Sequence, residues 1–147
     1  MSTIGIVVLA VALAATAAVA WWQRSRDGAL RPGRDEEGAV QAGSVFDRLG
    51  VRPGEADLTV VQFSTAFCGP CRATKARLAQ LQATHPRLAV VQVDAESHLD
   101  EVRELEVRRT PTLFYLDRSG AVIGRSSGAP RPEELTALVD AHAGVAG

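Results

Sequence analysis

Phe67-Cys68-Gly69-Pro70-Cys71-Arg72 is the stretch of sequence around which the rest of the chain is organised. It contains both cysteines of the 147-residue chain, and they lie three positions apart. The apolar, β-rich run 58–63 before it predicts a buried strand, and the run 72–84 after it predicts a helix. The two sulfurs therefore belong to a strand-to-helix junction, with Cys68 at the entrance of the helix.

This position favours redox chemistry of the two sulfurs. The unsatisfied N–H groups of a helix N-terminus favour a thiolate, so we expect Cys68 to be the exposed nucleophile. Cys71 follows nearly one turn later on the same face, within the Cα separation that a disulfide tolerates. Gly69 allows a tight turn between the sulfurs, and Pro70 suits the first helical turn. The spacing predicts a disulfide that opens and closes without backbone movement.

Two structural alternatives compete with a redox pair. In a zinc site the cysteines would need two further ligands, but the histidines, at 85, 98 and 142, have no zinc-binding spacing. A static disulfide is the second alternative, although a bridge across so short a loop stabilises a fold little through chain entropy. The redox interpretation is therefore preferred, with no metal and no organic cofactor expected.

The N-terminal segment predicts a membrane anchor. Residues 4–22 carry no charge and, as a helix, span about 28 Å, close to the hydrocarbon thickness of a bilayer. Trp21 and Trp22 would lie at the interface. The alternative is a cleaved signal peptide, because residues 18–20 (Ala-Val-Ala) fit a cleavage site. The absence of a basic segment before residue 4 favours an uncleaved, single-pass anchor over residues 1–23.

The charges around this segment predict its orientation. Four arginines follow it and none precedes it: Arg24, Arg26, Arg31 and Arg34. By the positive-inside rule, the C-terminal side would lie in the cytoplasm, with an extracytoplasmic location as the alternative. A single lysine among 16 basic residues, with many alanines, is typical of a bacterial protein. The formal net charge of −1 gives no indication of nucleic-acid binding.

The remainder divides by composition into three parts. Residues 24–43 are rich in glycine and charge, which predicts a flexible linker reaching roughly 25 Å. Residues 44–143 are globular, beginning with a short helix that Ser44 would cap, and 144–147 form a loose tail. Strands are predicted at 58–63, 88–93, 112–116 and 121–125, with helices at 72–84, 98–106 and from 132. This order predicts an α/β fold with a mixed central sheet flanked by helices.

Residues 58–142 resemble the thioredoxin family. The Cys-Gly-Pro-Cys motif at 68–71 resembles its active site, and Arg109-Thr110-Pro111-Thr112 is similar to its cis-proline loop. Gly128 matches the glycine after the last strand. The resemblance implies a thioredoxin fold in which Thr110, Pro111 and Gly128 bind an extended substrate segment and Pro111 is cis. An ordinary trans proline at an edge strand is the alternative for Pro111.

The chain departs from the family pattern at several positions. Phe67 stands where many thioredoxins have tryptophan, and Gln62 stands where the family usually has a buried acid. The lysine that partners this acid corresponds in our alignment to Val90. An amide cannot accept a proton near neutral pH, so the usual proton acceptor for Cys71 is missing. The three histidines have no family role, and we expect them at the surface.

These observations predict a membrane-tethered thiol–disulfide oxidoreductase that reduces protein disulfides through Cys68 and Cys71. Its expected partners are disulfide-containing proteins, the lipid bilayer around residues 4–22, and a thioredoxin reductase or membrane electron donor. One alternative is a binding module that holds a membrane partner without turnover. Another is an exported reductant of apoproteins outside the membrane.

Overall fold

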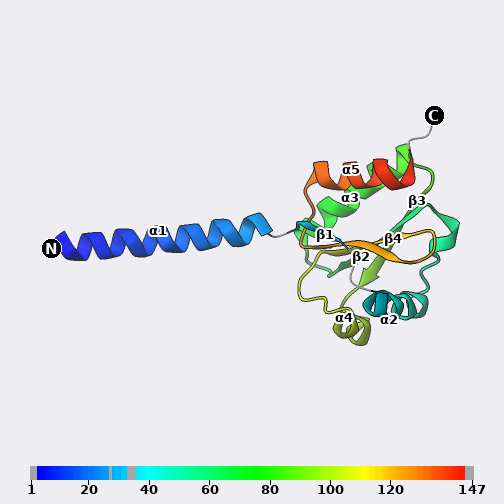
Figure 1. Cartoon of the computed structure of the whole chain (residues 1–147), viewed down its shortest axis with the longest axis horizontal. Coiled ribbons are helices and arrows are strands. Elements are labelled where there is room, and N and C mark those ends of the chain that lie inside the picture. Colours follow the sequence, from blue (N-terminus) through cyan, green and yellow to red (C-terminus); the bar gives the residue numbers. More distant parts are fainter. Residues whose placement is uncertain (1–2, 27, 33–35, 145–147) are drawn as a thin grey trace.

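The computed structural model describes residues 3–26, 28–32 and 36–144. A single five-stranded sheet lies between two pairs of helices, with α3 and α5 on one face and α2 and α4 on the other (Figure 1). Helix α1 extends away from this domain. The elements are α1 (Thr3–Arg26), β1 (Leu30–Pro32), α2 (Glu36–Arg48), a 3₁₀ turn (Pro53–Glu55), β2 (Leu58–Ser64), α3 (Gly69–Thr84), β3 (Leu88–Asp94), α4 (Leu99–Glu104), β4 (Thr112–Asp117), β5 (Val122–Ser127) and α5 (Pro132–Ala143).

The sheet has the strand order β1-β5-β4-β2-β3. Strand β2 pairs in parallel with β3 through the crossover helix α3, and all other neighbours are antiparallel. The predicted mixed sheet and thioredoxin fold are therefore confirmed. Six of the seven residues of β2 are buried, as expected for an interior strand covered on both faces.

Alternate residues of the strands form two separate cores. Val61 and Phe63 of β2 pack toward α2 and α4, where the ring of Phe114 meets Phe46 and Phe63 edge to face at 5.3 and 5.9 Å between centroids. Val60 packs on the opposite face, in the cluster that includes residues of α3 and α5. This alternation follows from the two-residue period of a strand and fixes which way each side chain of β2 points.

The predicted linker over residues 24–43 is wrong in two places. Leu30–Pro32 forms strand β1, which pairs antiparallel with β5. Helix α2 begins at Glu36, so Ser44 lies inside it and does not cap its N-terminus. The composition of the segment did not reveal β1, because an edge strand can be held by backbone hydrogen bonds without an apolar pattern. Residues 27, 33–35 and 145–147 lie outside the described part of the chain.

Helix α1 makes few contacts with the domain, and all its side chains are exposed. It is the one described helix that is long and apolar enough to cross a membrane, and a signal sequence would satisfy the same criteria. Arg26 lies over the ring of Trp22, with its guanidinium carbon 3.9 Å from the ring centroid. The apolar segment therefore ends in a helical turn that carries an aromatic side chain and a positively charged one.

Candidate active site

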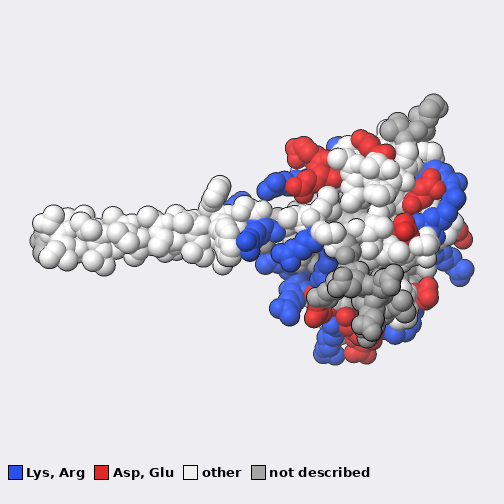
Figure 2. Space-filling view, viewed as in Figure 1, with Lys and Arg blue, Asp and Glu red and all other residues white. Residues whose placement is uncertain are grey.

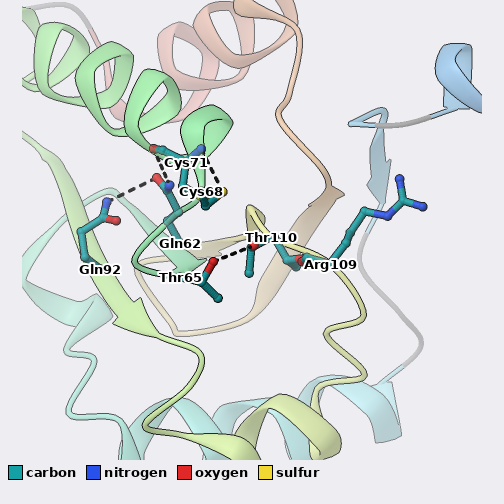
Figure 3. Close-up of a disulfide and its surroundings, with 8 residues drawn as sticks. Gln62, Thr65, Cys68, Cys71, Gln92, Arg109 and Thr110 are labelled. Atoms are coloured by element: carbon teal, nitrogen blue, oxygen red, sulfur yellow. Dashed lines mark hydrogen bonds between the residues drawn. A yellow bond between two sulfur atoms is a disulfide. The ribbon is translucent and has the colours of Figure 1, made fainter.

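The two cysteines form a disulfide at the N-terminus of α3 (Figure 3). Their Cα atoms are 5.2 Å apart. Cys68 is the N-cap residue, and its Sγ accepts a hydrogen bond from the backbone N–H of Cys71 at 3.2 Å. Helix α3 therefore directs one of its free N–H groups at the sulfur that we expect to carry negative charge in the reduced protein.

The exposure of the motif differs sharply between neighbouring residues. Phe67 is 96% exposed, whereas Cys68 is 9% and Cys71 3% exposed. Cys68 is thus the more accessible sulfur, but it is not openly exposed as we predicted. The N–H of Cys68 donates to the carbonyl oxygen of Thr65 at 3.3 Å in the turn that precedes the helix.

The loop before β4 has the geometry that the resemblance implied. The Thr110–Pro111 peptide bond is cis. The N–H of Gly128 donates to the carbonyl of Pro111 at 2.8 Å, and the hydroxyls of Thr110 and Thr65 are 3.5 Å apart. Thr65 was not among the residues predicted for the site. These hydrogen bonds bring Pro111 and Gly128 together, and Figure 3 shows Thr110 beside Thr65 in the turn that leads to Cys68.

A buried amide lies beneath the disulfide. Gln62 is fully buried, and its Nε2 donates to the carbonyl oxygen of Cys71 at 2.9 Å. Its Oε1 accepts a hydrogen bond at 3.3 Å from Nε2 of Gln92 on the neighbouring strand (Figure 3). In this chain the side chain that bonds to Gln62 from the neighbouring strand is therefore Gln92. Parallel pairing places Gln92 beside Gln62, and Val90 beside Val60 two residues earlier.

The histidines are distributed differently from our prediction. His85 is buried, and its ring nitrogens lie 2.8 Å from Oδ1 of Asp140 and 2.9 Å from the carbonyl oxygen of Leu81. It was expected at the surface because a lone histidine in a polar stretch gives no sign of these two partners. His142 is exposed and His98 partly exposed. The described residues contain no group of three or more histidine, cysteine or acidic side chains that could hold a metal ion.

Comparison with known proteins agrees with this geometry. Residues 44–141 match the family described as Thioredoxin. Thioredoxin H4-1 of Oryza sativa subsp. japonica is 30% identical over 89 residues, covering 58% of this chain and 67% of that protein. The thioredoxin of Bos taurus is 34% identical over 83 residues, covering 56% of this chain and 77% of that protein.

Among solved structures, the oxidised form of mitochondrial thioredoxin 3 from Saccharomyces cerevisiae has the same fold. It is 28% identical to this chain, with a TM-score of 0.55, and the match covers 67% of this chain and 88% of the yeast protein. Family, relatives and fold thus agree with a cysteine pair placed at a helix N-terminus beside a cis-proline loop. The chain therefore belongs to the thioredoxin family and is a protein-disulfide oxidoreductase.

Proposed function

We propose that the chain is a membrane-anchored reductase that transfers two electrons from the Cys68–Cys71 dithiol to a disulfide in a protein substrate. The observation that carries this proposal is the hydrogen bond from the N–H of Cys71 to Sγ of Cys68 at the start of α3. A donor in this position, with the positive end of the helix, stabilises a thiolate on Cys68.

The reaction would proceed in two exchanges. The thiolate of Cys68 attacks one substrate sulfur, which breaks the substrate disulfide, forms a mixed disulfide and releases a thiolate that takes a proton from water. Cys71 then loses its proton and attacks Sγ of Cys68, which releases the second substrate thiol. The product is the Cys68–Cys71 disulfide seen in the structure. A thioredoxin reductase or a membrane donor would return two electrons to it.

The substrate would lie along the loop beside the disulfide. The backbone of Thr110 would pair with an extended segment, and the buried Pro111 and Gly128, joined by their hydrogen bond, would hold this loop in position. Phe67 offers an exposed aromatic ring next to Cys68. An extended segment bound through backbone groups suits a protein substrate better than a small disulfide.

Substitution of each cysteine tests this mechanism. We expect Cys68→Ser to abolish dithiothreitol-driven reduction of insulin, and Cys71→Ser to accumulate a mixed disulfide with the substrate. The adduct is measured by non-reducing electrophoresis and mass spectrometry. The mechanism is wrong if Cys71→Ser turns over insulin as fast as the wild-type protein.

A second function is favoured by the buried amide at Gln62. Without a titratable group beneath Cys71, the domain would bind a membrane partner through the surface around Cys68 and Pro111 without turning over. The insulin assay separates the two functions, since a binding module would accelerate reduction no more than the Cys68→Ser variant does.

We also propose that α1 is retained as an anchor and that the domain faces the cytoplasm. The tryptophan pair supports the anchor, and the arginines that follow it support this orientation. A membrane-impermeant maleimide, applied to intact spheroplasts after reduction, tests it. Cys68 should be labelled only after lysis, and labelling before lysis would place the domain outside.

A further inference from the structure

Helix α1 joins the domain at the same end of the sheet as the active site. The strand registers show this, because Phe63 at the end of β2 pairs with Thr112, and Thr112 pairs with Ser127. Leu30, the first residue of β1, pairs with Ser126 beside it. The end of β2, the start of β4, the end of β5 and the start of β1 therefore lie together. The disulfide follows β2, the cis-proline loop precedes β4, and α1 precedes β1.

The junction is fixed by direct contacts. The N–H of Gly28 donates to the carbonyl oxygen of Ser127 at 2.8 Å, one residue before Gly128 of the site. Gly28 has a φ of +75°, and a Cβ atom there would overlap the carbonyl oxygen of Ala129. Only glycine fits this approach. Arg131 also reaches the last turn of α1, where its guanidinium donates to the carbonyl oxygen of Ser25 at 3.4 Å.

The chain between the apolar segment and this junction is short. From Trp22 to Gly28 it has four residues in helix α1, which add about 6 Å, and two further residues, which add at most about 7 Å. The polar layer on one side of a bilayer is about 5–8 Å thick. Gly28 is thus held at or just beyond the headgroups, whereas the linker first expected would have allowed roughly 25 Å.

Basic side chains surround this junction. We define the arginine collar as five exposed arginines on α1, β1 and the two loops beside the disulfide: Arg24, Arg26, Arg31, Arg109 and Arg131. Figure 2 shows basic side chains gathered where α1 meets the domain. In Figure 3, Arg109 extends from the cis-proline loop toward the side where β1 and the end of α1 lie. Such a collar complements the anionic headgroups of a cytoplasmic leaflet.

We propose that the β1–β5 pairing and the arginine collar hold the disulfide end of the domain against the bilayer. The substrates would then be disulfides in membrane-bound proteins, close to the headgroup layer. This inference rests on the proposed reductase function and anchor, and it names the substrate class of the same site. The two electrons still pass from the Cys68–Cys71 dithiol to the substrate disulfide, which is reduced to two thiols.

The orientation is tested with the full chain in vesicles of phosphatidylcholine and phosphatidylglycerol that contain a headgroup spin-labelled lipid. A bimane fluorophore is attached to Cys68 in the Cys71→Ser variant. For comparison, it is attached to a Ser119→Cys variant that lacks both native cysteines, because Ser119 is exposed in the turn at the opposite end of the sheet. We expect stronger quenching at position 68. Equal quenching at both positions, or stronger quenching at 119, would overturn the inference.

Substrate choice is tested with one disulfide peptide attached to a lipid through a spacer of either about 4 or about 40 flexible residues. Dithiothreitol is the electron donor, and enzyme and peptide share the same vesicles. Wild-type protein should reduce the short-spacer peptide faster, by about tenfold, because its site is confined near the headgroups. Equal rates, or faster reduction of the long-spacer peptide, would overturn the inference.

Gly28→Ala should disrupt the pairing of β1 with β5. The short-spacer and long-spacer peptides should then be reduced at nearly equal rates, and soluble insulin should still be reduced. Gly54→Ala is the matched control, since a Cβ atom at Gly54 meets nothing within 4 Å. A Gly28→Ala protein that reduces insulin yet keeps the preference for the short-spacer peptide would contradict the role of β1.

If Gly28→Ala does not fold, replacing the collar arginines by glutamine must reduce the difference in quenching between positions 68 and 119. If the wild-type protein fails to reduce insulin, the proposed reductase function itself is wrong. If it reduces insulin but reduces the short-spacer and long-spacer peptides at equal rates, the reductase function stands and only the inference about substrate choice is overturned.

Discussion

Nε2 of Gln92 donates a hydrogen bond to Oε1 of Gln62 at 3.3 Å, directly beneath the active-site disulfide. Gln62 in turn donates to the carbonyl oxygen of Cys71 at 2.9 Å, so the two amides form a chain that ends at the first turn of α3. Neither side chain titrates near neutral pH. The pair supports the position of Cys71 but supplies no base for it, in line with the absence of the family's usual acid at position 62.

A carboxylate at position 62 should restore a proton acceptor. We expect Gln62→Asp to increase the rate of insulin reduction at neutral pH, by up to about tenfold, because general-base catalysis contributes at least this much in other enzymes. Gln62→Asn is the control, since it shortens the side chain equally and remains an amide. Equal rates for the two variants would show that deprotonation of Cys71 does not limit turnover.

The same substitution should lower stability in a pH-dependent manner. Burial would raise the pKa of the new carboxyl above its unfolded value of about 4, so the folded protein would hold a proton that the unfolded chain loses. The free energy of unfolding should therefore decrease as pH rises from about 4 toward the folded pKa. Urea unfolding of Gln62→Asp and Gln62→Asn across this range measures the difference, which should grow with pH.

Phe67 is exposed enough to act on substrate without supporting the fold. Because 96% of its surface is accessible, Phe67→Ala should change the free energy of unfolding by less than about 0.5 kcal/mol. Loss of an aromatic contact should raise the KM for protein substrates about fivefold, equivalent to about 1 kcal/mol. Leu99→Ala removes another exposed apolar side chain, at the start of α4, and should leave KM unchanged.

His85 should matter for stability and not for catalysis. Its buried ring contacts Asp140 on α5 and the carbonyl oxygen of Leu81 on α3, so His85→Ala leaves both partners without it. We expect a loss of about 2 kcal/mol in the free energy of unfolding, with the rate of insulin reduction unchanged. His142→Ala, at an exposed position of α5, should have no effect on either quantity.

Tyr115 provides a spectroscopic test of the core. It is the only tyrosine of the chain, and burial raises the pKa of its hydroxyl well above the usual value, although the hydroxyl lies 2.9 Å from Oγ of Ser126. The native protein should therefore show no tyrosinate absorbance at a pH where the denatured chain, with a pKa of about 10, is ionised. The folded state keeps the proton that the unfolded state loses, so stability should fall as pH rises above about 10.

Much of the fold and of the site was predictable because short patterns encode local structure. The apolar run before the cysteines predicted β2, the run after them predicted α3, and the spacing of Cys68 and Cys71 predicted their disulfide. The resemblance to thioredoxins supplied the cis bond before Pro111, which no periodicity indicates. Each of these features depends on residues close together in the sequence.

Contacts between residues that are far apart in the sequence could not be predicted in this way. The partner of Gln62 is Gln92, because the register of two parallel strands determines the pairing. His85 is buried because Asp140, 55 positions later, reaches it. The pairing of Leu30–Pro32 with β5 places the start of β1 beside the end of β5. The residues alone predict a thioredoxin-like redox domain after an apolar segment. The position of the domain relative to that segment depends on backbone pairing and strand register, which leave no pattern in the residues themselves.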